Sequence, residues 1–579
     1  MIKEAILHNM TREFVYSIGA NSYMIKIRTK ANDMVIVNLY YYNKYHNVIK
    51  DHKVHTVRMT KVATDELFDY YEAIVNVNHI TTKYYFELID GSGDYIYYAN
   101  YRFLNEPSKD DSYSFDFPIQ AKMEDAPSYI DWMADGIVYQ IFPDRYYRGD
   151  NYIPNKSHTK WSASPKWNSI YGGTIKGITQ KLDHIKDLGA TIIYLTPIFE
   201  SPSNHKYNTT DYMKLDPDFG TKEDFKEFVD TAHSKGIKVI LDGVFNHSGE
   251  DFFPFKDLLK NGQKSDYKDW FFPFSFPVKR IHGIKPNYQS FSYFGGMPKL
   301  NTMNQDVQKY FTDMIDYWMT NFNVDGWGLD VADEVSHEFW TVFRKAVKKN
   351  KKDAPLIGEI WYDSRDWLQG NEFDCVMNYQ FYRCVEQFIA RGTMTVSEFV
   401  SNLEFVRGNT NYNAYRMLWN LIDSHDCPRF ITCAGDDVRK LKLAALLQFT
   451  FTGTPMIYYG DEVGMKGKGD PDCRRGMIWD SDKVDTDVLN YYKSLTKLRH
   501  SHPCLRRGEF HLVYKDDDKQ VLVYKKVYED ETLLVAINNS DTEVTLTSLT
   551  NKINMIDNQV MDGVLPPFTG VIMQLHNKL

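Results

Sequence analysis

Eight short apolar runs recur between Gly136 and Glu462, and each run ends in polar or charged residues. In chain order they are GIVYQIFPDR, TIIYLTPIFE, KVILDGVFNH, VDGWGLDVADE, PLIGEIW, FDCVMNY, RMLWNLIDSHD and TPMIYYGDE. Strands that are apolar along their whole length are typical of a parallel sheet covered on both faces. Eight strand–helix units in one block predict an α/β chain built around a (β/α)8 TIM barrel.

Two of the segments between these runs show why helices are expected there. Thr221 is a suitable N-cap for a helix that ends before Gly236. Apolar residues follow helical spacing before the fourth run: Val307, Tyr310, Phe311, Met314, Ile315 and Trp318.

Sequence rich in strand signals flanks the barrel on both sides. Runs such as YMIKIRT, DMVIVNLYYY and KYYFELID predict an N-terminal β-sandwich, followed by a linker at 120–132 that contains Pro127. The runs FHLVY, QVLVYKKVY, TLLVAIN and EVTLTSL predict a small C-terminal β-sandwich. The predicted domains are 1–119, 120–505 with an excursion at about 248–302 after the third strand, and 506–579.

Composition excludes several classes of function. The net charge is -9, and no Lys/Arg run gathers on one predicted element, so nucleic acid is not an expected partner. The sequence has no long uncharged apolar span and no secretory leader, so no membrane partner is expected. The six cysteines stand singly without a CxxC, which predicts reduced thiols and a cytoplasmic protein.

Polar side chains, most of them acidic or histidine, collect where the predicted strands end, at the rim where barrels of this kind place their chemistry. They are Asp242, Asn246, His247, Asp330, Glu359, His425 and Asp426. Retaining glycoside hydrolysis needs two carboxylates roughly 5 Å apart. Adjacent strands lie about 4.8 Å apart, which suits Asp330 and Glu359. An aldolase or isomerase on this fold would need a lysine or a metal at the rim, and no such cluster is present.

Several motifs, in this order, resemble a known family. DGVFNH, GWGLDVADE, GEIW and SHD resemble the four short regions of the α-amylase family of retaining glycoside hydrolases. MPKLN, at 297–301, resembles the fifth region of its neopullulanase, cyclomaltodextrinase and maltogenic amylase branch, as do SPSNHKYNTTDY and GDPDCRR. The resemblance covers essentially the whole chain, including the extra N-terminal β domain.

The resemblance implies roles for residues at matching positions. Asp330 would be the nucleophile, Glu359 the acid/base and Asp426 the carboxylate that stabilises the transition state. The implied substrate-binding residues are Tyr207, His247 and His425 at the cleavage subsite, Asp470 and Arg474 at the next glucose, and Trp361, Phe291 and Phe294 on the acceptor side. The implied substrates are α-1,4-linked: cyclodextrins, maltooligosaccharides, starch and pullulan. Some members also transfer glycosyl groups, and the branch often dimerises through its N-terminal domain.

Gly328 departs from the family pattern, which has arginine two residues before the nucleophile. A guanidinium there would favour the charged form of Asp330 and orient it by hydrogen bonds. Three interpretations stay open: a weakened hydrolase, a glucan-binding protein without turnover, or another Arg or Lys reaching into the gap. Asn208 replaces the usual aspartate of HKYDT, and we expect a changed subsite rather than a lost one.

The calcium site of relatives is also altered, so no metal or other cofactor is expected. Relatives supply oxygen ligands from NGDPSND and GGD, where this chain has RGDNYIPN and GGT. Four ligand positions are replaced, by Arg148, Ile153, Pro154 and Thr174. Asp150 and the Gly172 carbonyl are too few for a hard cation. The charge of Arg148 is expected to stand where the ion would be.

Overall fold

The structure is a computed structural model that describes residues 1–19, 21–45, 53–107, 113–118, 127–153, 157–280 and 285–575. Two compact units make up the chain. The first contains 1–129, 363–374 and 397–415, and the second contains 130–362, 375–396 and 416–579. Pro154 and residues 119–126, which include most of the linker expected at 120–132, lie outside the described residues.

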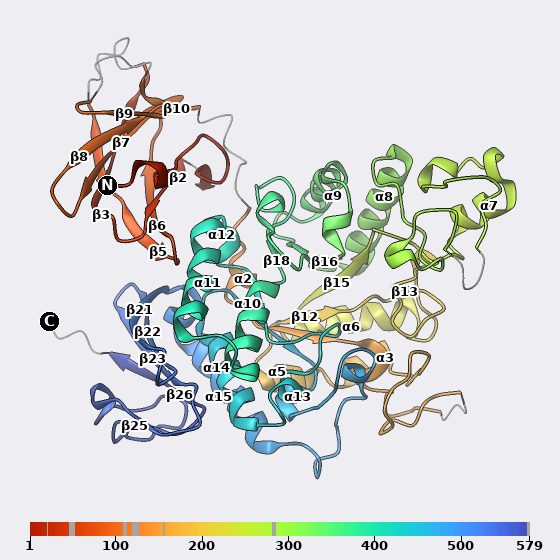
Figure 1. Cartoon of the computed structure of the whole chain (residues 1–579). Coiled ribbons are helices and arrows are strands. Elements are labelled where there is room, and N and C mark those ends of the chain that lie inside the picture. Colours follow the sequence, from red (N-terminus) through yellow and green to blue (C-terminus); the bar gives the residue numbers. More distant parts are fainter. Residues whose placement is uncertain are drawn as a thin grey trace. The chain divides into compact units, whose positions relative to one another are not determined.

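The second unit contains the predicted barrel, an eight-stranded sheet of parallel strands (Figure 1). Its strands, in spatial order, are β18 (Cys375–Val376), β17 (Leu356–Gly358), β16 (Gly326–Asp330), β15 (Lys238–Val244), β12 (Ile192–Leu195), β11 (Val138–Ile141), β20 (Thr454–Tyr458) and β19 (Trp419–Leu421). A parallel bridge between Met377 and Trp419 joins the two ends of this order. All eight predicted runs therefore supply barrel strands.

Helices surround these strands. The helices of the second unit are α2 (Asp131–Ala134), α3 (Pro143–Tyr146), α4 (Ile175–Gln180), α5 (Leu182–Leu188), α6 (Lys222–Ser234), α7 (Phe253–Asn261), α8 (Gln305–Phe322), α9 (His337–Asn350), α10 (Tyr379–Val385), α13 (Phe430–Cys433), α14 (Val438–Thr450), α15 (Thr486–Ser501) and α16 (Pro503–Arg507). Both argued helices, α6 and α8, are confirmed, and α6 begins at a capping box formed by Thr221 and Asp224.

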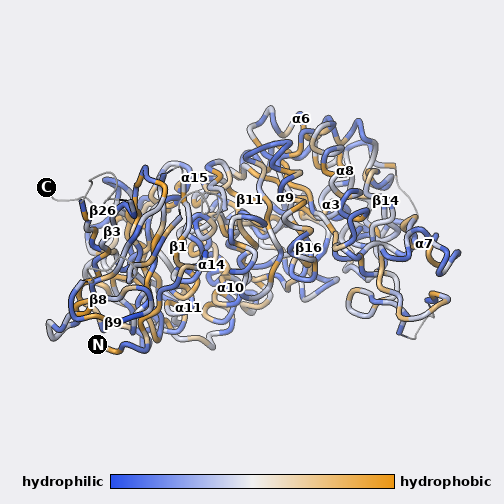
Figure 2. The backbone as a smooth tube through the Cα atoms, turned by 90° about the horizontal axis from the view of Figure 1, so that it is seen from above, coloured by the Kyte–Doolittle hydropathy of each residue, from blue (hydrophilic) through white to orange (hydrophobic). Residues whose placement is uncertain are grey.

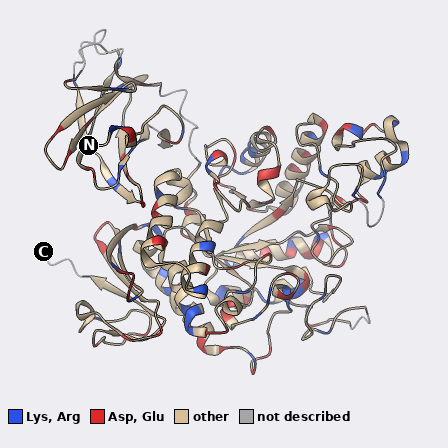
Figure 3. Cartoon of the chain, viewed as in Figure 1, with Lys and Arg blue, Asp and Glu red and all other residues tan. Residues whose placement is uncertain are grey.

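Burial explains why the barrel runs read as continuously apolar. Every residue of β11, β12, β16, β17 and β20 is buried, because side chains on one face fill the barrel and those on the other face meet helices. Figure 2 shows apolar stretches near β11 and β16 and hydrophilic stretches near α6 and α7. Figure 3 shows acidic and basic residues interspersed along the helices. Within the described residues, no helix combines the length and apolar character needed to cross a bilayer.

The C-terminal sheet has the order β21 (Glu509–Asp516), β22 (Val521–Tyr528), β23 (Glu531–Asn538) and β26 (Thr569–Leu575). Its core includes Val521, Val571 and Leu549. The expectation of a full strand in EVTLTSL is wrong. Only Val544–Thr545 is strand, as β24 paired with β25 (Val564–Leu565), and Thr547–Leu549 form a 3-10 turn that buries Leu549.

The first unit contains the predicted N-terminal sandwich. One sheet has the order β1 (Val15–Gly19), β2 (Ser22–Lys30), β6 (Phe68–Asn76) and β5 (Thr60–Thr64). The other has β4 (His55–Arg58), β3 (Met34–Asn43), β7 (Thr81–Asp90), β8 (Tyr95–Ala99) and β9 (Arg102–Leu104), with β10 (Phe115–Pro118) against β7. One hydrophobic core includes Ile25, Leu39 and Phe86.

Two pieces from the barrel part of the sequence, 363–374 and 397–415, are built into the same unit as this sandwich. The second piece includes most of α11 (Val396–Asn409) and α12 (Tyr412–Tyr415). Arg407 of α11 donates two hydrogen bonds, of 2.9 and 2.8 Å, to the carboxylate of Glu72 in β6, and Lys26 of β2 lies 3.5 Å from that carboxylate. All three side chains are buried.

Candidate active site

A cavity of about 610 Å³ lies where the barrel strands end and holds most of the predicted site residues. Those lining it are Asp330, Glu359, Asp426, Tyr207, His247, Asp470, Arg474, Trp361 and Phe291. His425 lies behind the wall, buried, with its Nε2 3.2 Å from Asp426. Phe294 is not among the lining residues and is 53% exposed, so no contact with this cavity supports its expected role.

The two central carboxylates come from neighbouring strands. Asp330 is the last residue of β16, and Glu359 directly follows β17. The backbone N–H of Val331 donates to Glu359 Oε2 at 3.4 Å, which ties the second carboxylate to the residue after the first. Val331 has a φ of 43°, a strained value for a β-branched residue. The strain lies directly beside the predicted nucleophile.

Burial and mutual repulsion govern how these carboxyl groups titrate. Burial, followed by the charge of Asp426, raises the pKa of Glu359 to about 7, although Trp361 donates to its Oε1 at 3.0 Å. Burial and the charges of Glu359 and Asp242 hold the pKa of Asp330 well above its usual range. A carboxyl group with a raised pKa can serve as a general acid near neutral pH, whereas a nucleophile must be ionised.

The ring of Tyr194 lies directly against Gly328. Gly328 pairs in register with Asp242 of β15, and a Cβ added to it would lie 2.5 Å from Cε2 of Tyr194. The ring of Tyr194, on β12, therefore fills the space where a side chain at 328 would begin. Oδ2 of Asp330 is buried and has no hydrogen-bond partner, and neither has Oδ1 of Asp242.

Among the described residues, no basic side chain stands in for the arginine that the resemblance implies at 328. In the part of the chain that the structure describes, no Lys, Arg or His nitrogen lies within 4.0 Å of an Asp330 carboxylate oxygen. Arg474, which lines the same cavity, pairs instead with Asp426 at 2.8 Å and with Asp470 at 3.1 Å. The open interpretation that another cation reaches into the gap therefore finds no support among these residues.

The predicted sugar-binding ring and histidine form one hydrogen-bonded chain. Gln140 Nε2 donates to Nδ1 of His425 at 3.0 Å, which leaves the imidazole proton on Nε2, facing the hydroxyl of Tyr207. That hydroxyl donates to Asp242 at 2.9 Å. Burial lowers the pKa of His425 to about 4, so the imidazole is neutral at pH 7. The chain fixes the direction of each polar group before any sugar enters.

The remaining predicted residues have definite neighbours. His247 stacks on Phe291 with ring centroids 4.9 Å apart, and burial lowers its pKa to about 3. Trp361 stacks on Tyr379 at 3.8 Å, with its indole N–H directed to Glu359. Asn208 accepts a hydrogen bond from Ser201 at 2.8 Å and does not line the cavity, so the expected change of subsite stays a prediction.

Other lining residues were not proposed as site residues from the sequence. They are Arg145, Trp167, Asn204, His205, Met297, Val331, Asp333 and Pro471. Asp242, which was noted at a strand end, is bound into the site by Tyr207, and Tyr379 lies 3.4 Å from Glu359. The sequence signal for Asp242 was its position near the end of an apolar run. Trp167 and Tyr379 had none, because no periodicity marks a ring that lines a cavity or a hydroxyl that reaches a catalytic carboxylate.

In the altered calcium loop, two of the substituted side chains make hydrogen bonds within the protein. The Arg148 guanidinium donates to the carbonyl oxygens of Tyr171 and Thr159, both at 2.6 Å. Thr174 accepts from the Gly177 N–H as the N-cap of α4 and donates to the Arg148 carbonyl. Ile153 is 84% exposed. Within the described residues, no group of three His, Cys, Asp or Glu side chains is placed to hold a metal ion.

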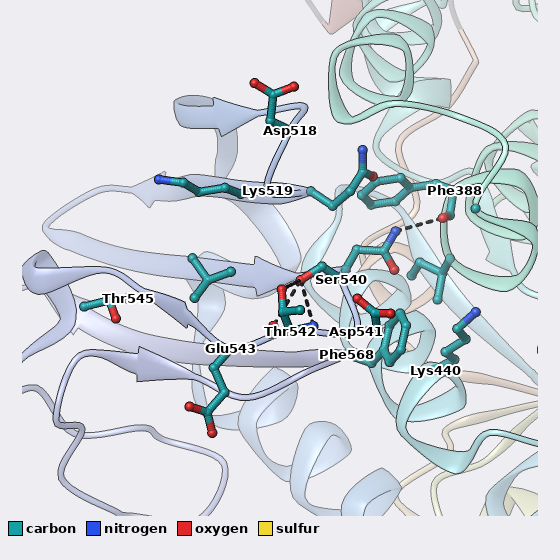
Figure 4. Close-up of a pocket in the computed structure, with 15 residues that line it drawn as sticks. Phe388, Lys440, Asp518, Lys519, Ser540, Asp541, Thr542, Glu543, Thr545 and Phe568 are labelled. Carbon is teal, nitrogen blue, oxygen red and sulfur yellow. Dashed lines mark hydrogen bonds between the residues drawn. The ribbon is translucent and has the colours of Figure 1, made fainter.

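A second cavity, of about 730 Å³, lies between the C-terminal sheet and the barrel helix α14 (Figure 4). Ser540, Thr542 and Phe568 line it from the C-terminal side and Lys440 from α14. None of the predicted site residues lines it, and the three carboxylates are confined to the first cavity.

Comparison with known proteins decides the family. The description "Alpha amylase, catalytic domain" matches residues 140–508. The chain belongs to the α-amylase family, and it is a glycoside hydrolase. The family's N-terminal ig-like domain matches residues 1–121, and its C-terminal domain matches 508–565.

Relatives within the family match almost end to end. A cyclomaltodextrinase of Geobacillus thermopakistaniensis (strain MAS1) is 43% identical, covering 93% of this chain and 92% of that protein. Neopullulanase 2 of Thermoactinomyces vulgaris is 40% identical, covering 93% and 91%. An intracellular maltogenic amylase of Bacillus subtilis (strain 168) is 36% identical, covering 93% and 91%. A solved cyclomaltodextrinase structure superimposes with a TM-score of 0.91 at 39% identity, covering 100% and 98%.

Proposed function

We propose that the protein hydrolyses α-1,4-glucosidic bonds of cyclodextrins, maltooligosaccharides, pullulan or starch, with retention and through a covalent glycosyl-enzyme. The observation that carries the proposal is that Asp330, Glu359 and Asp426, from three different strand ends, line one cavity. The names of the related cyclomaltodextrinase and neopullulanase support an α-glucan substrate.

In the proposed reaction, an Asp330 oxygen attacks the anomeric carbon while Glu359 gives its proton to the departing glycosidic oxygen. Glu359 then takes a proton from water, and the water oxygen displaces Asp330 from the same carbon. Asp426, held by Arg474, stabilises the positive charge that develops on the sugar ring. The raised pKa of Glu359, about 7, suits the first step.

Two alternatives remain distinct from this proposal. A glucan-binding protein without turnover would share the fold and the sugar contacts, and the unpartnered Oδ2 of Asp330 favours it over full activity. A glucanotransferase would share the covalent step and differ only in the acceptor. We prefer a weakened hydrolase, because every group that makes or breaks a bond is present.

Trapping tests the mechanism directly. Incubation with 5-fluoro-α-glucosyl fluoride is expected to add one glycosyl mass, on the peptide that contains Asp330. Asp330→Asn is expected to abolish the label, whereas Asp313→Asn, on the exposed face of α8, keeps it. Chromatography of products from β-cyclodextrin, maltotriose and pullulan then separates hydrolysis from transfer. No label and no product from any substrate would leave the binding protein as the better account.

We also propose a homodimer formed through the N-terminal domain, as implied for this branch. Analytical ultracentrifugation of the full chain is expected to give twice the mass of 67.8 kDa. A single species at the mass of one chain would contradict it. We propose a cytoplasmic protein on two grounds: Cys384, Cys427, Cys433, Cys473 and Cys504 form no disulfide in the described part of the chain, and one relative is named intracellular. Cell fractionation tests this localisation.

A further inference from the structure

Trp167 is an exposed indole at the mouth of the active-site cavity. It is the only one of the chain's eleven Trp residues, all within the described part, that leaves most of its side chain in solvent, at 72%. Its indole has no ring contact or hydrogen bond with the described residues, yet it lines the cavity that holds the three carboxylates. Such an apolar surface at a binding cavity is available for a ligand to cover.

Buried polar groups hold the turn that carries this ring. Ser169 N–H bonds the carbonyl of Lys166 at 3.0 Å and closes the turn. Asn204 donates to the carbonyls of Trp167 and Ser169 at 3.0 and 2.7 Å. Arg145 donates to the Ser169 carbonyl at 2.7 Å. Because Asn204 and Arg145 are buried, the backbone under the indole is fixed before a ligand arrives.

The same arginine shows which wall of the cavity Trp167 belongs to. Nη1 of Arg145 donates to the carbonyl oxygen of Arg474, so one guanidinium joins the Trp167 turn to the segment of Asp470 and Arg474. The rings predicted for the acceptor side, Phe291 and Trp361, come from the excursion after β15 and from the loop after β17. Trp167 therefore lies on the same wall of the cavity as Asp470 and Arg474, the pair implied to hold the second glucose on the donor side.

We propose that Trp167 is a stacking platform for a further glucose unit on the donor side, beyond the unit held by Asp470 and Arg474. This assignment rests on the proposed α-glucan substrate. The apolar face of a pyranose packs on the indole, as CH groups pack on other aromatic rings. A contact of this kind contributes roughly three- to tenfold in binding. Trp167 thereby sets a preference for longer glucans without touching the reacting atoms.

The test is chain-length dependence. The ratio of kcat/KM for maltohexaose to that for maltotriose is expected to fall about fivefold in Trp167→Ala, since only the longer chain reaches the platform. Trp167→Phe keeps a ring and is expected to retain the ratio within about twofold. Phe274→Ala is the matched control, because Phe274 is 60% exposed and does not line the cavity. An unchanged ratio in Trp167→Ala, or an equal fall in Phe274→Ala, overturns the proposal.

A binding measurement separates this inference from the proposed function. In a Glu359→Gln background, maltohexaose is expected to shift the Trp emission to shorter wavelength, because a sugar covers the exposed indole. The shift is expected to disappear in Glu359→Gln/Trp167→Phe. If the wild-type protein shows no turnover but this Trp167-dependent shift is present, the proposed hydrolysis is contradicted and the proposed sugar stacking on Trp167 is supported. If maltohexaose saturates the binding site without shifting the Trp emission, the proposal for Trp167 is overturned.

Discussion

At the scale of single residues, Gly328 stands where the family resemblance implies an arginine, and three other residues surround it. The buried Oδ2 of Asp330 has no hydrogen-bond partner, the ring of Tyr194 lies against Gly328, and Asp242 keeps an unpartnered oxygen. A buried carboxylate with no partner is costly to ionise. We therefore expect the chemistry to be limited by the charge state of the nucleophile rather than by the geometry of the proton donor.

Gly328→Arg tests this directly. Arginine must displace the ring of Tyr194, as any side chain at 328 must, so its effect is measured against Gly328→Ala. Guanidinium hydrogen bonds to Asp330 are expected to give kcat on maltotriose at least tenfold above that of Gly328→Ala, since one charge-assisted contact is worth about 1.5–3 kcal/mol. Gly328→Ala is the matched control: it meets Tyr194 at the same 2.5 Å and adds no charge, so it is expected to lose activity and stability. Equal behaviour of the two variants would show that packing, not charge, governs the position.

The pH profile gives an independent reading of the same residue. The first step requires Glu359 protonated, so kcat/KM is expected to fall as pH rises through about 7. It also requires Asp330 ionised, and its raised pKa brings the acid limb close to the alkaline one, giving a narrow profile. Because a cation lowers a carboxyl pKa, Gly328→Arg is expected to move the acid limb to lower pH. An acid limb at the same pH in both proteins would contradict this cause.

At the scale of elements, the strand ends were the predictable part of the site. An apolar run fixes where a barrel strand ends, so the sequence alone could place Asp330, Glu359 and Asp426 at one rim. The rings could not be placed in this way, because Phe294 and Trp167 lie on turns whose direction depends on long-range contacts. The strand predicted for EVTLTSL is wrong for a local reason. Val544 and Leu546 follow the two-residue alternation of a strand, but Leu549 comes three residues after Leu546, and the chain turns to bury it.

The loop after β11 offers a prediction about metal dependence. We propose that the Arg148 guanidinium satisfies carbonyl oxygens that would otherwise face an ion, so chelation by EDTA is expected to leave Tm and activity unchanged. Arg148→Gln is expected to lower Tm, because the carbonyls of Tyr171 and Thr159 lose charged donors. Metal analysis that finds stoichiometric calcium bound at this loop would refute the assignment.

At the scale of the whole molecule, the chain order and the compact units do not coincide. Sequence patterns treated the barrel segment as one continuous block, whereas 363–374 and 397–415 are built into the unit that contains the sandwich. Sequence periodicity indicates which face of a helix or strand is buried, but not which other element covers that face. The patterns therefore could not reveal this division. The buried group of Lys26, Glu72 and Arg407 shows what that packing involves.

Glu72→Gln is the variant that tests this group. Removing its charge leaves Lys26 and Arg407 buried without their shared partner, which is expected to cost about 3 kcal/mol or more of unfolding free energy. Chemical denaturation measures the loss. Asp313→Asn breaks an exposed pair with Lys309 and is expected to change stability little. Similar small losses in both variants would mean that the buried group is not a stability determinant.

The membership of α11 in the first unit limits how this protein can be shortened. A chain begun at residue 130 would carry Arg407 and its neighbours without the strands that now cover them. Such a truncated protein would expose to water the Arg407 side chain and the surface of α11 that the sandwich strands now cover. It would be prone to aggregate. The N-terminal sandwich is thus a structural complement of the barrel sequence and not a detachable accessory.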